Sequence, residues 1–274
     1  MMARRSSTQV ANVGDIAYKA SNGKIKTIAL DSWSTSLGTP VGVVVIPSGF
    51  APDNGLARIM SLYWPGFGGE NQTDENNPWG STDSNFGLPS YVNVPVTNNT
   101  DLTAEGYGDY GNLPSDKFTG TASYVDPVAA YNRNQNMIPS PYLGDTPNPA
   151  YYAEIEGGNA LSDFNGKGNT DKMYASGWSF APYNAKEYKV AGAEEIEWYL
   201  PAIGELGYLM VRFNKIQTAL SKMNVPLLNS TGEYWSSTKE NIYQQFALYA
   251  KYGQVRDTSR TDRKLVRAFA QLDF

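Results

Sequence analysis

The chain has 274 residues, of which 41% are hydrophobic, 13% aromatic and 18% charged, and its formal net charge is −5. These proportions supply enough apolar side chains for a packed core, while the many Gly, Pro, Asn, Ser, Thr and Tyr residues favour a loop-rich α+β protein over a helical bundle. The sequence contains no cysteine and no histidine, which excludes disulfides, thiol nucleophiles, Ser-His relays and imidazole-bound metals.

Residues 1–13 are predicted to form a polar N-terminal arm. The stretch from Met1 to Ser7 carries two arginines but runs into polar residues, so it lacks the apolar centre of a signal peptide. The longest apolar run, residues 40–47, is far shorter than the roughly 20 residues that a membrane helix requires. We therefore expect synthesis in the cytoplasm without a signal peptide, and no membrane insertion.

Residues 14–63 are predicted to form an N-terminal β-strand region. Three strand candidates, residues 14–19, 25–30 and 41–46, are separated by Gly-containing turns. The run from Val43 to Ile46 is continuously apolar instead of alternating, which predicts a strand buried on both faces. Residues 57–62 are expected to pair beside it.

Residues 64–150 are predicted to form a loop-rich acidic insertion. The sequence here has ten acidic and two basic residues and no clear periodicity. Its many aromatic side chains favour an ordered insertion that packs on the domain, because exposing so many rings is costly; the alternative is disorder. A short helix is predicted with Asp126 as N-cap and Pro127 in the first turn.

Residues 151–274 are predicted to form the core of the domain. The segment 163–171 has the look of a calcium loop, but Lys167 stands where an oxygen ligand is required, so we expect a solvated turn. Apolar residues recur at spacings of three and four from Leu206 to Met223, which predicts one core helix that begins at Pro201 and ends at Asn224.

Three strand candidates follow, at residues 233–237, 246–252 and 265–270. In the middle one, Phe246, Leu248 and Ala250 would face the core. Because side chains alternate along a strand, the intervening set is expected on the opposite, presented face: Gln245, Ala247, Tyr249 and Lys251.

Four blocks follow one another in this last third: Trp198-Tyr-Leu-Pro-Ala-Ile-Gly-Glu-Leu206, the helix, Gly232-Glu-Tyr-Trp-Ser-Ser-Thr238 and Val266-Arg-Ala-Phe-Ala270. Their order and spacing resemble the C-type-lectin-like domains related to formylglycine-generating enzymes, and particularly the variable proteins of diversity-generating retroelements from gut Bacteroides and their phages. The resemblance covers roughly residues 178–274 and, more weakly, 14–62. It implies an α+β, C-type-lectin-like fold with an N-terminal β-layer and a long loop-rich insertion.

In that family a reverse transcriptase copies a template inaccurately at adenines, and the copy replaces the 3′ end of the gene. The resemblance thus implies a variable region at about residues 239–265, mounted on an apolar frame of Trp235, Phe246, Leu248, Val255, Val266 and Phe269. The candidate ligand-binding positions mix aromatic, cationic and small polar groups, as antibody paratopes do. They are Tyr243, Gln244, Tyr249, Lys251, Tyr252, Gln254, Arg256, Asp257, Thr258, Ser259, Thr261, Asp262 and Arg263. The alternative is that residues 254–264 are simply a solvated loop.

Enzymatic activity is not expected. The formylglycine-generating relatives depend on active-site cysteines, which this chain lacks. Two carboxylates would suffice for a glycosidase, and Glu194, Glu195, Glu197 and Glu205 lie close together in the sequence. However, Glu205 falls in the first turn of the predicted helix, where it stabilises the helix dipole. The Glu-Pro-Asn and Gln-Pro-Asp triplets of calcium-dependent sugar-binding lectins are absent, so we expect no cofactor and no metal.

The leading hypothesis is a hypervariable ligand- or receptor-binding protein, associated with a virion tail and used by a phage or prophage to recognise its host. Its partner would be an unknown macromolecular ligand such as a bacterial surface protein or glycan. Residues 239–267 are locally cationic, but the acidic chain lacks a clustered Lys/Arg face, so no nucleic-acid partner is expected. The oligomeric state stays open, a homo-oligomer included. The alternative function is a non-diversified lectin-like adhesin or structural assembly module.

Overall fold

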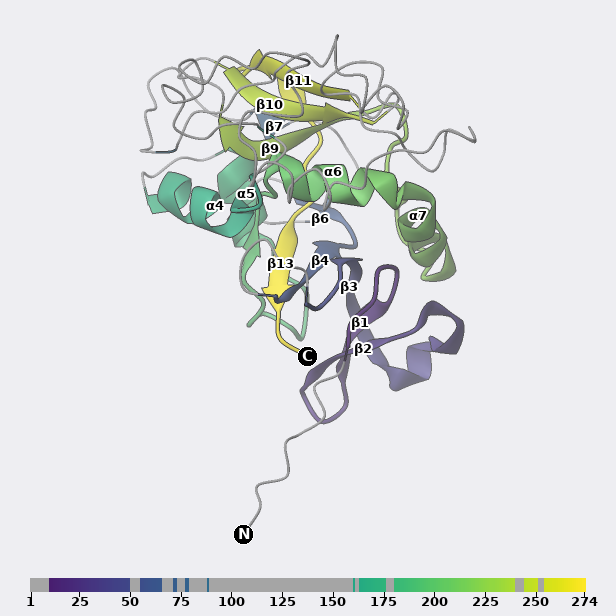
Figure 1. Ribbon diagram of the computed structural model, residues 1–274. Helices are drawn as coiled ribbons and strands as arrows, with labels where there is room; N and C mark the ends of the chain where they lie inside the picture. Colours follow the sequence, from purple (N-terminus) through teal and green to yellow (C-terminus); the bar gives the residue numbers. More distant parts are fainter. Residues whose placement is uncertain are drawn as a thin grey trace.

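The computed structural model describes residues 10–49, 55–65, 71–72, 77–78, 88, 160, 163–175, 180–239, 244–250 and 254–274. Most of the 64–150 insertion and the helix predicted at Asp126 lie outside these residues. The described part is an α+β fold in which helices lie between a six-stranded sheet and a three-stranded sheet (Figure 1). Among the described residues, no helix has the length and apolarity needed to cross a membrane.

The larger sheet has the strand order β2-β1-β3-β4-β13-β8, and every pair in it is antiparallel. Its strands are β1 (Ile16–Ala20), β2 (Ile25–Ile28), β3 (Gly38–Ile46), β4 (Ala57–Ser61), β8 (Trp198–Tyr199) and β13 (Phe269–Leu272), with short 3-10 helices η1 (Leu30–Ser32) and η2 (Thr35–Leu37) before β3. The predicted pairing of residues 57–62 beside the third strand is confirmed. The N-terminal strands and the last strand of the chain therefore belong to one sheet.

Strand β3 is buried on both faces, as its continuous apolar run predicts. Val43 and Val45 belong to the core cluster that contains the long helices, whereas Val44 belongs to a second cluster on the other face of the sheet. All three side chains are fully buried.

The helices are α4 (Gly166–Ala175), α5 (Ala181–Glu187), α6 (Ile203–Val211) and α7 (Phe213–Lys222). The single helix expected between Pro201 and Asn224 is thus two helices. The break is at Arg212, which has φ −109° and ψ 16° and places its guanidinium 4.7 Å from the centre of the Tyr208 ring. Helix α6 is buried from Ile203 to Met210, whereas α7 buries only one face, so the break separates two different packing environments.

The segment 163–171 is not a solvated turn, and that prediction is wrong. Residues from Gly166 onward form α4, and the buried Asp163 carboxylate accepts a hydrogen bond from the Asn165 backbone N–H at 2.9 Å just ahead of the helix. The physical reason is that a short acidic side chain before a helix satisfies backbone donors that would otherwise lack a partner.

A fully buried charge pair lies in the core. The Glu205 Oε1 atom accepts hydrogen bonds from Arg58 Nε at 3.1 Å and from the Tyr199 hydroxyl at 2.8 Å, and Oε2 accepts the Ala202 backbone N–H at 2.8 Å. Burial raises the pKa of Glu205 to about 7, against the opposing effects of Arg58, the Ala202 N–H and Tyr199. The structural role expected for Glu205 is therefore that of a helix cap paired to a neighbouring strand.

The smaller sheet has the order β11-β10-β9, formed by β9 (Glu233–Lys239), β10 (Gln244–Tyr249) and β11 (Gln254–Ser259). Two-stranded pairs join β5 (Trp64–Pro65) to β6 (Asn71–Gln72) and β12 (Arg263–Lys264) to β7 (Asn77–Pro78). Residues 254–259 are thus a strand and not a loop, while the strand expected at 265–270 shrinks to β13 in the other sheet. Figure 1 shows the smaller sheet above α6.

The face of β10 that was expected to be presented to solvent is accessible only in part. Phe246 and Leu248 are buried, as expected, but Gln245 and Ala247 on the opposite face are also buried, at 0% and 1% exposure. Ala247 belongs to the same core cluster as Trp235, so both faces of this middle strand are covered there. Among the described residues of that face, Tyr249 alone is half-buried.

Candidate binding surface and polar hollow

The strand register of the smaller sheet brings Tyr249 beside two other strands. Tyr249 pairs with Glu233 on β9 and with Gln254 on β11, at the end of the sheet. The neighbouring Leu248 pairs with Tyr234 and Val255, whose side chains are buried. The chain therefore passes from a packed core to a half-exposed aromatic ring within one residue.

A turn, residues 258–263, runs from the last two residues of β11 to the first residue of β12. The Thr258 hydroxyl donates to Asp262 Oδ2 at 2.6 Å, and the Asp262 N–H donates to the Ser259 carbonyl at 3.0 Å. The hydroxyls of Ser259 and Thr261 lie 2.8 Å apart. These local contacts hold the turn while its side chains stay accessible, except for Arg260, which is buried.

After the turn, the chain runs alongside β9. The Leu265 N–H donates to the Glu233 carbonyl and the Trp235 N–H donates to the Leu265 carbonyl, both at 2.9 Å. Because these bonds fix the backbone, the Lys264 side chain reaches the Glu233 carboxylate. Its Nζ lies 3.9 Å from Asp262 Oδ2 and 5.3 Å from the centre of the Trp235 ring.

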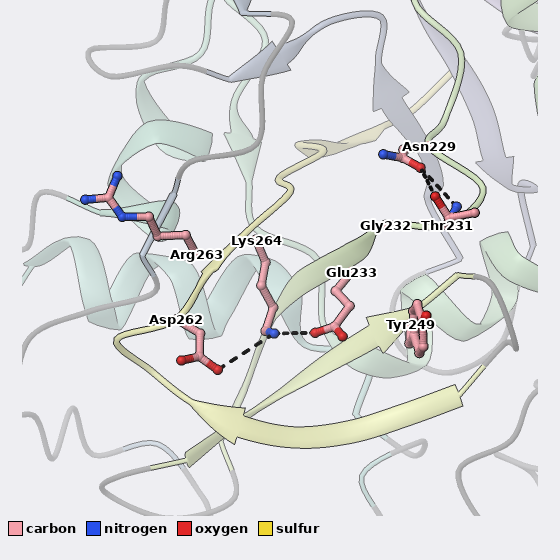
Figure 2. A pocket seen from close by; sticks show the side chains of 8 residues that line it. All are labelled: Asn229, Thr231, Gly232, Glu233, Tyr249, Asp262, Arg263 and Lys264. Carbon is pink, nitrogen blue, oxygen red and sulfur yellow. Dashed lines mark hydrogen bonds and ion pairs between the residues drawn. The ribbon is translucent and has the colours of Figure 1, made fainter.

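A polar hollow of about 530 Å³ lies at this end of the sheet (Figure 2). Figure 2 shows the Lys264 ammonium between the carboxylates of Glu233 and Asp262, with Tyr249 beyond Glu233. Among the residues that the structure describes, two acidic and two basic side chains line the hollow, so their formal charges cancel. The lining residues are Asn229, Thr231, Gly232, Glu233, Tyr249, Asp262, Arg263 and Lys264.

One wall of the hollow is fixed by a tight loop before β9. Asn229 Oδ1 accepts from the backbone N–H of Thr231 at 2.9 Å and from its hydroxyl at 3.0 Å. The Gly232 carbonyl accepts the Ala250 N–H at 2.9 Å. A Cβ at Gly232 would come within 2.3 Å of the Leu265 side chain, so a larger residue there would force the buried Leu265 to move.

The structure brings three of the candidate ligand-binding residues together at the hollow: Tyr249, Asp262 and Arg263. Thr258 is half-buried, while Ser259 and Thr261 are exposed on the same turn; Gln244 is half-buried at the start of β10. Gln254, Arg256 and Asp257 are positions on β11. Tyr243, Lys251 and Tyr252 lie outside the described residues.

Sequence reasoning missed Glu233, Lys264, Asn229 and Thr231 as members of this site. Glu233 and Lys264 are 31 residues apart and meet only because the chain after the turn runs back beside β9. The available signal was a charged residue at the very start of the predicted strand, directly before Tyr234 and Trp235. The predicted apolar frame, by contrast, is confirmed: Trp235, Phe246, Leu248, Val255, Val266 and Phe269 are at most 1% exposed.

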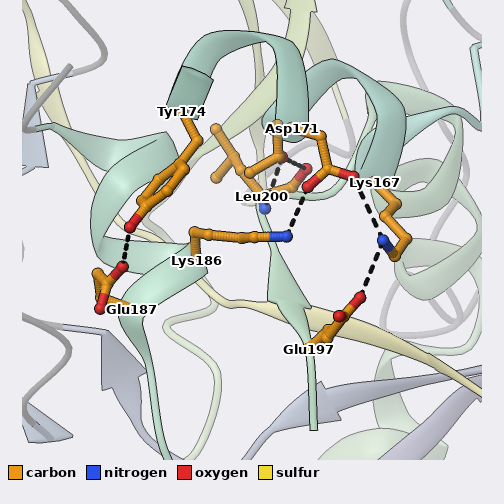
Figure 3. A network of polar contacts seen from close by, with 8 residues as sticks. Lys167, Asp171, Tyr174, Lys186, Glu187, Glu197 and Leu200 are labelled. Carbon is orange, nitrogen blue, oxygen red and sulfur yellow. Dashed lines mark hydrogen bonds and ion pairs between the residues drawn. The ribbon is translucent and has the colours of Figure 1, made fainter. Parts of the chain in front are cut away.

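A second charged cluster joins α4, α5 and the segment before β8 (Figure 3). The Asp171 carboxylate lies 2.5 Å from Lys186 Nζ and 3.2 Å from Lys167 Nζ, and Lys167 also lies 3.0 Å from Glu197. Partial burial would raise the pKa of Asp171, but the two lysines outweigh it and hold the pKa below its usual value. Each charged side chain in this cluster pairs with one on another turn or another element. The cluster therefore holds α4, α5 and the segment before β8 together.

The other carboxylates considered for a glycosidase are also engaged. Glu195 lies 2.8 Å from Lys19, and Glu194 accepts the Gly192 backbone N–H at 2.7 Å. Within the described parts of the chain, no three Asp, Glu, His or Cys side chains gather in a way that could hold a metal ion.

Comparisons with known proteins give one similar solved structure of note. No protein-family model matches the chain, and no curated protein matches it. The chain is similar to a fimbrial protein from Bacteroides ovatus, with 16% sequence identity and a TM-score of 0.49. That alignment covers 95% of this chain and 49% of the fimbrial protein, so the chain spans about half the length of that protein.

Proposed function

We propose that this chain is a hypervariable ligand-binding protein of the kind encoded by diversity-generating retroelements, built on a C-type-lectin-like fold and used in phage or prophage recognition of a host receptor. The observation that carries the proposal is the arrangement of the C-terminal segment. The exposed Asp262 and Arg263 line a polar hollow together with the half-buried Tyr249, Ser259 and Thr261 are exposed on the same turn, and the apolar frame residues of this segment are buried.

This arrangement suits a protein whose surface residues are substituted while its fold stays the same. Exposed substitutions away from special features usually alter the free energy of unfolding by no more than about 0.5 kcal/mol. Removal of a buried ring costs about 3–5 kcal/mol. A protein that displays many alternative side chains needs these two sets of positions to be separate, and among the described residues the exposed Ser259, Thr261 and Arg263 are distinct from the buried frame.

The genetic setting offers a direct test. The proposal expects a near-copy of the 3′ end of the coding region, differing at adenines, beside a reverse-transcriptase gene. A locus without such a copy would favour the alternative, a non-diversified lectin-like adhesin or assembly module.

Binding to cells provides the test at the protein level. Labelled protein should bind intact cells of at least one strain in a panel of gut Bacteroides, and a variant with Thr258, Ser259, Thr261 and Arg263 all changed to alanine should lose that binding. Its free energy of unfolding should fall by about 0.5 kcal/mol or less per substitution, because these side chains are exposed or half-buried.

The matched control changes four exposed residues on other elements to alanine: Ser21, Lys24, Ser221 and Lys222. It should bind cells as the unmodified protein does. Equal binding by both variants, or loss of cooperative unfolding in the 258–263 variant, would contradict the displayed surface.

A further inference from the structure

The size and lining of the polar hollow distinguish between a protein partner and a small ligand. A protein partner is usually met by a surface of about 800 Å² per side with an apolar, aromatic centre. Among the described residues, the exposed large hydrophobic side chains are Val10 and Leu227, and neither lines the hollow. A concave site of about 530 Å³ falls instead within the range of about 300–1,000 Å³ typical of small ligands or single chain units.

The electrostatics of the hollow do not favour an ionic ligand. Lys264 is held by Glu233 and lies 3.9 Å from Asp262, so its charge is already compensated. With Arg263 the described part of the lining carries equal numbers of positive and negative charges. A ligand with its own charge would meet a like charge as well as an opposite one at close range, so the described lining gives it no net attraction over a neutral ligand.

The hydrogen-bonding groups of the lining match hydroxyls. Carboxylates accept hydrogen bonds only, and the arginine and lysine side chains donate only, while the Thr231 hydroxyl, whose proton is donated to Asn229 Oδ1, can still accept. A hydroxyl group both donates and accepts, so a polyhydroxylated ligand can satisfy both sets at once. The fixed loop from Asn229 to Gly232 holds part of this lining in place before a ligand arrives.

Tyr249 adds an apolar surface to this polar site. Its half-buried ring stands in register with Glu233 on the neighbouring strand. A tyrosine ring offers flat apolar faces with a polar tip. The C–H face of a sugar ring can lie on such a surface while its hydroxyls reach the adjacent carboxylates.

From these features we infer that the polar hollow binds a neutral saccharide, with Tyr249 as the stacking platform and Glu233, Asp262 and Thr231 as partners for its hydroxyls, and without a metal ion. The inference rests on the proposed function and names the ligand class of its surface.

An array of immobilised neutral, sialylated and sulfated oligosaccharides tests the inference. The unmodified protein should bind a neutral oligosaccharide, and the apparent Kd should be the same at low and high salt because no net charge is involved. Tyr249→Ala should weaken binding by about tenfold or more, whereas Tyr249→Phe, which keeps the ring, should bind within about threefold of the unmodified protein.

Two further measurements keep the result interpretable. Tyr183→Ala removes a half-buried tyrosine on α5, outside the hollow, and should leave binding unchanged. Thermal unfolding of each variant shows whether a loss of binding reflects a loss of fold. Binding confined to anionic glycans, or equal binding by Tyr249→Ala and the unmodified protein, would overturn the inference.

Treated cells distinguish this inference from the proposed function. Cell binding that is lost after periodate oxidation of sugars but survives proteinase K supports both. Binding that is lost after proteinase K, survives periodate and has no counterpart on the array overturns the saccharide and leaves the proposed function standing. Binding of a neutral saccharide on the array, with no binding to any strain, overturns the proposed function alone. Binding to neither overturns both.

Discussion

At the scale of single residues, Glu205 stands out because a carboxylate with no exposure sits among three donors from three directions. Arg58 comes from β4, Tyr199 from β8, and the Ala202 N–H from the start of α6. Each of these groups would lose a partner if Glu205 were removed. The side chain therefore links the larger sheet to the helix that lies beneath the smaller sheet.

The stability of the protein should depend on pH through this group. The pKa of Glu205 is raised to about 7 in the folded protein, above the value of about 4.5 of an ordinary glutamate, so the folded state holds this proton more tightly than the unfolded state. Its contribution to stability is complete below pH of about 4.5 and is lost as the pH rises through about 7. We expect the free energy of unfolding, measured by urea denaturation, to fall between these two pH values.

Glu205→Gln should remove most of that pH dependence because it cannot titrate. Glu197→Gln is the control, since the pKa of Glu197 is lowered by its hydrogen bond to Lys167 and by the charges of Lys167 and Lys186, and this group titrates below the window. An unchanged slope in the Glu205 variant would show that another group is responsible.

At the scale of elements, Thr238 connects the smaller sheet to two helices. Its hydroxyl donates to Asp163 Oδ2 at 2.7 Å and accepts the Ile203 N–H, at the start of α6, at 2.9 Å. Asp163 Oδ2 also accepts from the Asn169 side chain of α4 at 2.9 Å. One buried hydroxyl thus sets the position of β9 relative to α4 and α6.

Thr238→Val keeps the shape of the side chain but removes both hydrogen bonds. We expect a loss of about 2–4 kcal/mol in the free energy of unfolding, because a buried carboxylate and a buried N–H are each left short of a partner. Thr238→Ser, which retains the hydroxyl, is the matched control and should lose less than half as much. Urea denaturation of the two variants side by side measures the difference, and equal losses would assign the effect to packing alone.

Some elements could be predicted from the sequence and others could not, for a physical reason. The buried run at 43–46 and the apolar spacing from Leu206 to Met223 are local patterns, and both lie where predicted. No glycine or proline marks the helix break at Arg212 in the sequence. The break coincides with a change in what the two helices pack against. The burial of Gln245 likewise depends on what covers its strand, which alternation alone does not reveal.

The candidate site was predictable to a similar extent. The candidate positions that the resemblance implies include three residues that line the hollow, Tyr249, Asp262 and Arg263. It could not supply the meeting of Glu233 with Lys264, because that contact depends on which strand the chain returns to. Strand β11 was missed because the polar stretch from Gln254 to Ser259 reads as a loop until its pairing with β10 is known.

At the scale of the whole molecule, β13 completes the larger sheet. It pairs with β4 on one side and β8 on the other, so the larger sheet is continuous only when residues 269–272 are in place. Phe269 and Ala270 are fully buried within it. The segment that carries the hollow therefore begins and ends in structure that belongs to the core.

Truncation after Ala268 should abolish cooperative thermal unfolding, because it removes a strand from the interior of the sheet. Truncation after Leu272 removes only the exposed Asp273 and the half-buried Phe274, and it should unfold cooperatively with a modest loss in Tm. Circular dichroism on the two truncated proteins makes the comparison. A cooperative transition in the shorter protein would mean that β13 is dispensable.

Because β13 is the last strand of the chain, folding depends on an intact reading frame in the codons before it. Any premature stop or frameshift in the codons for residues 239–265 removes this strand as well, so the product fails to complete its sheet and is exposed to degradation. A codon replacement in the same stretch leaves the strand intact. If these codons are diversified as proposed, folding itself would discard the truncated and frameshifted products and retain products that differ only in displayed side chains.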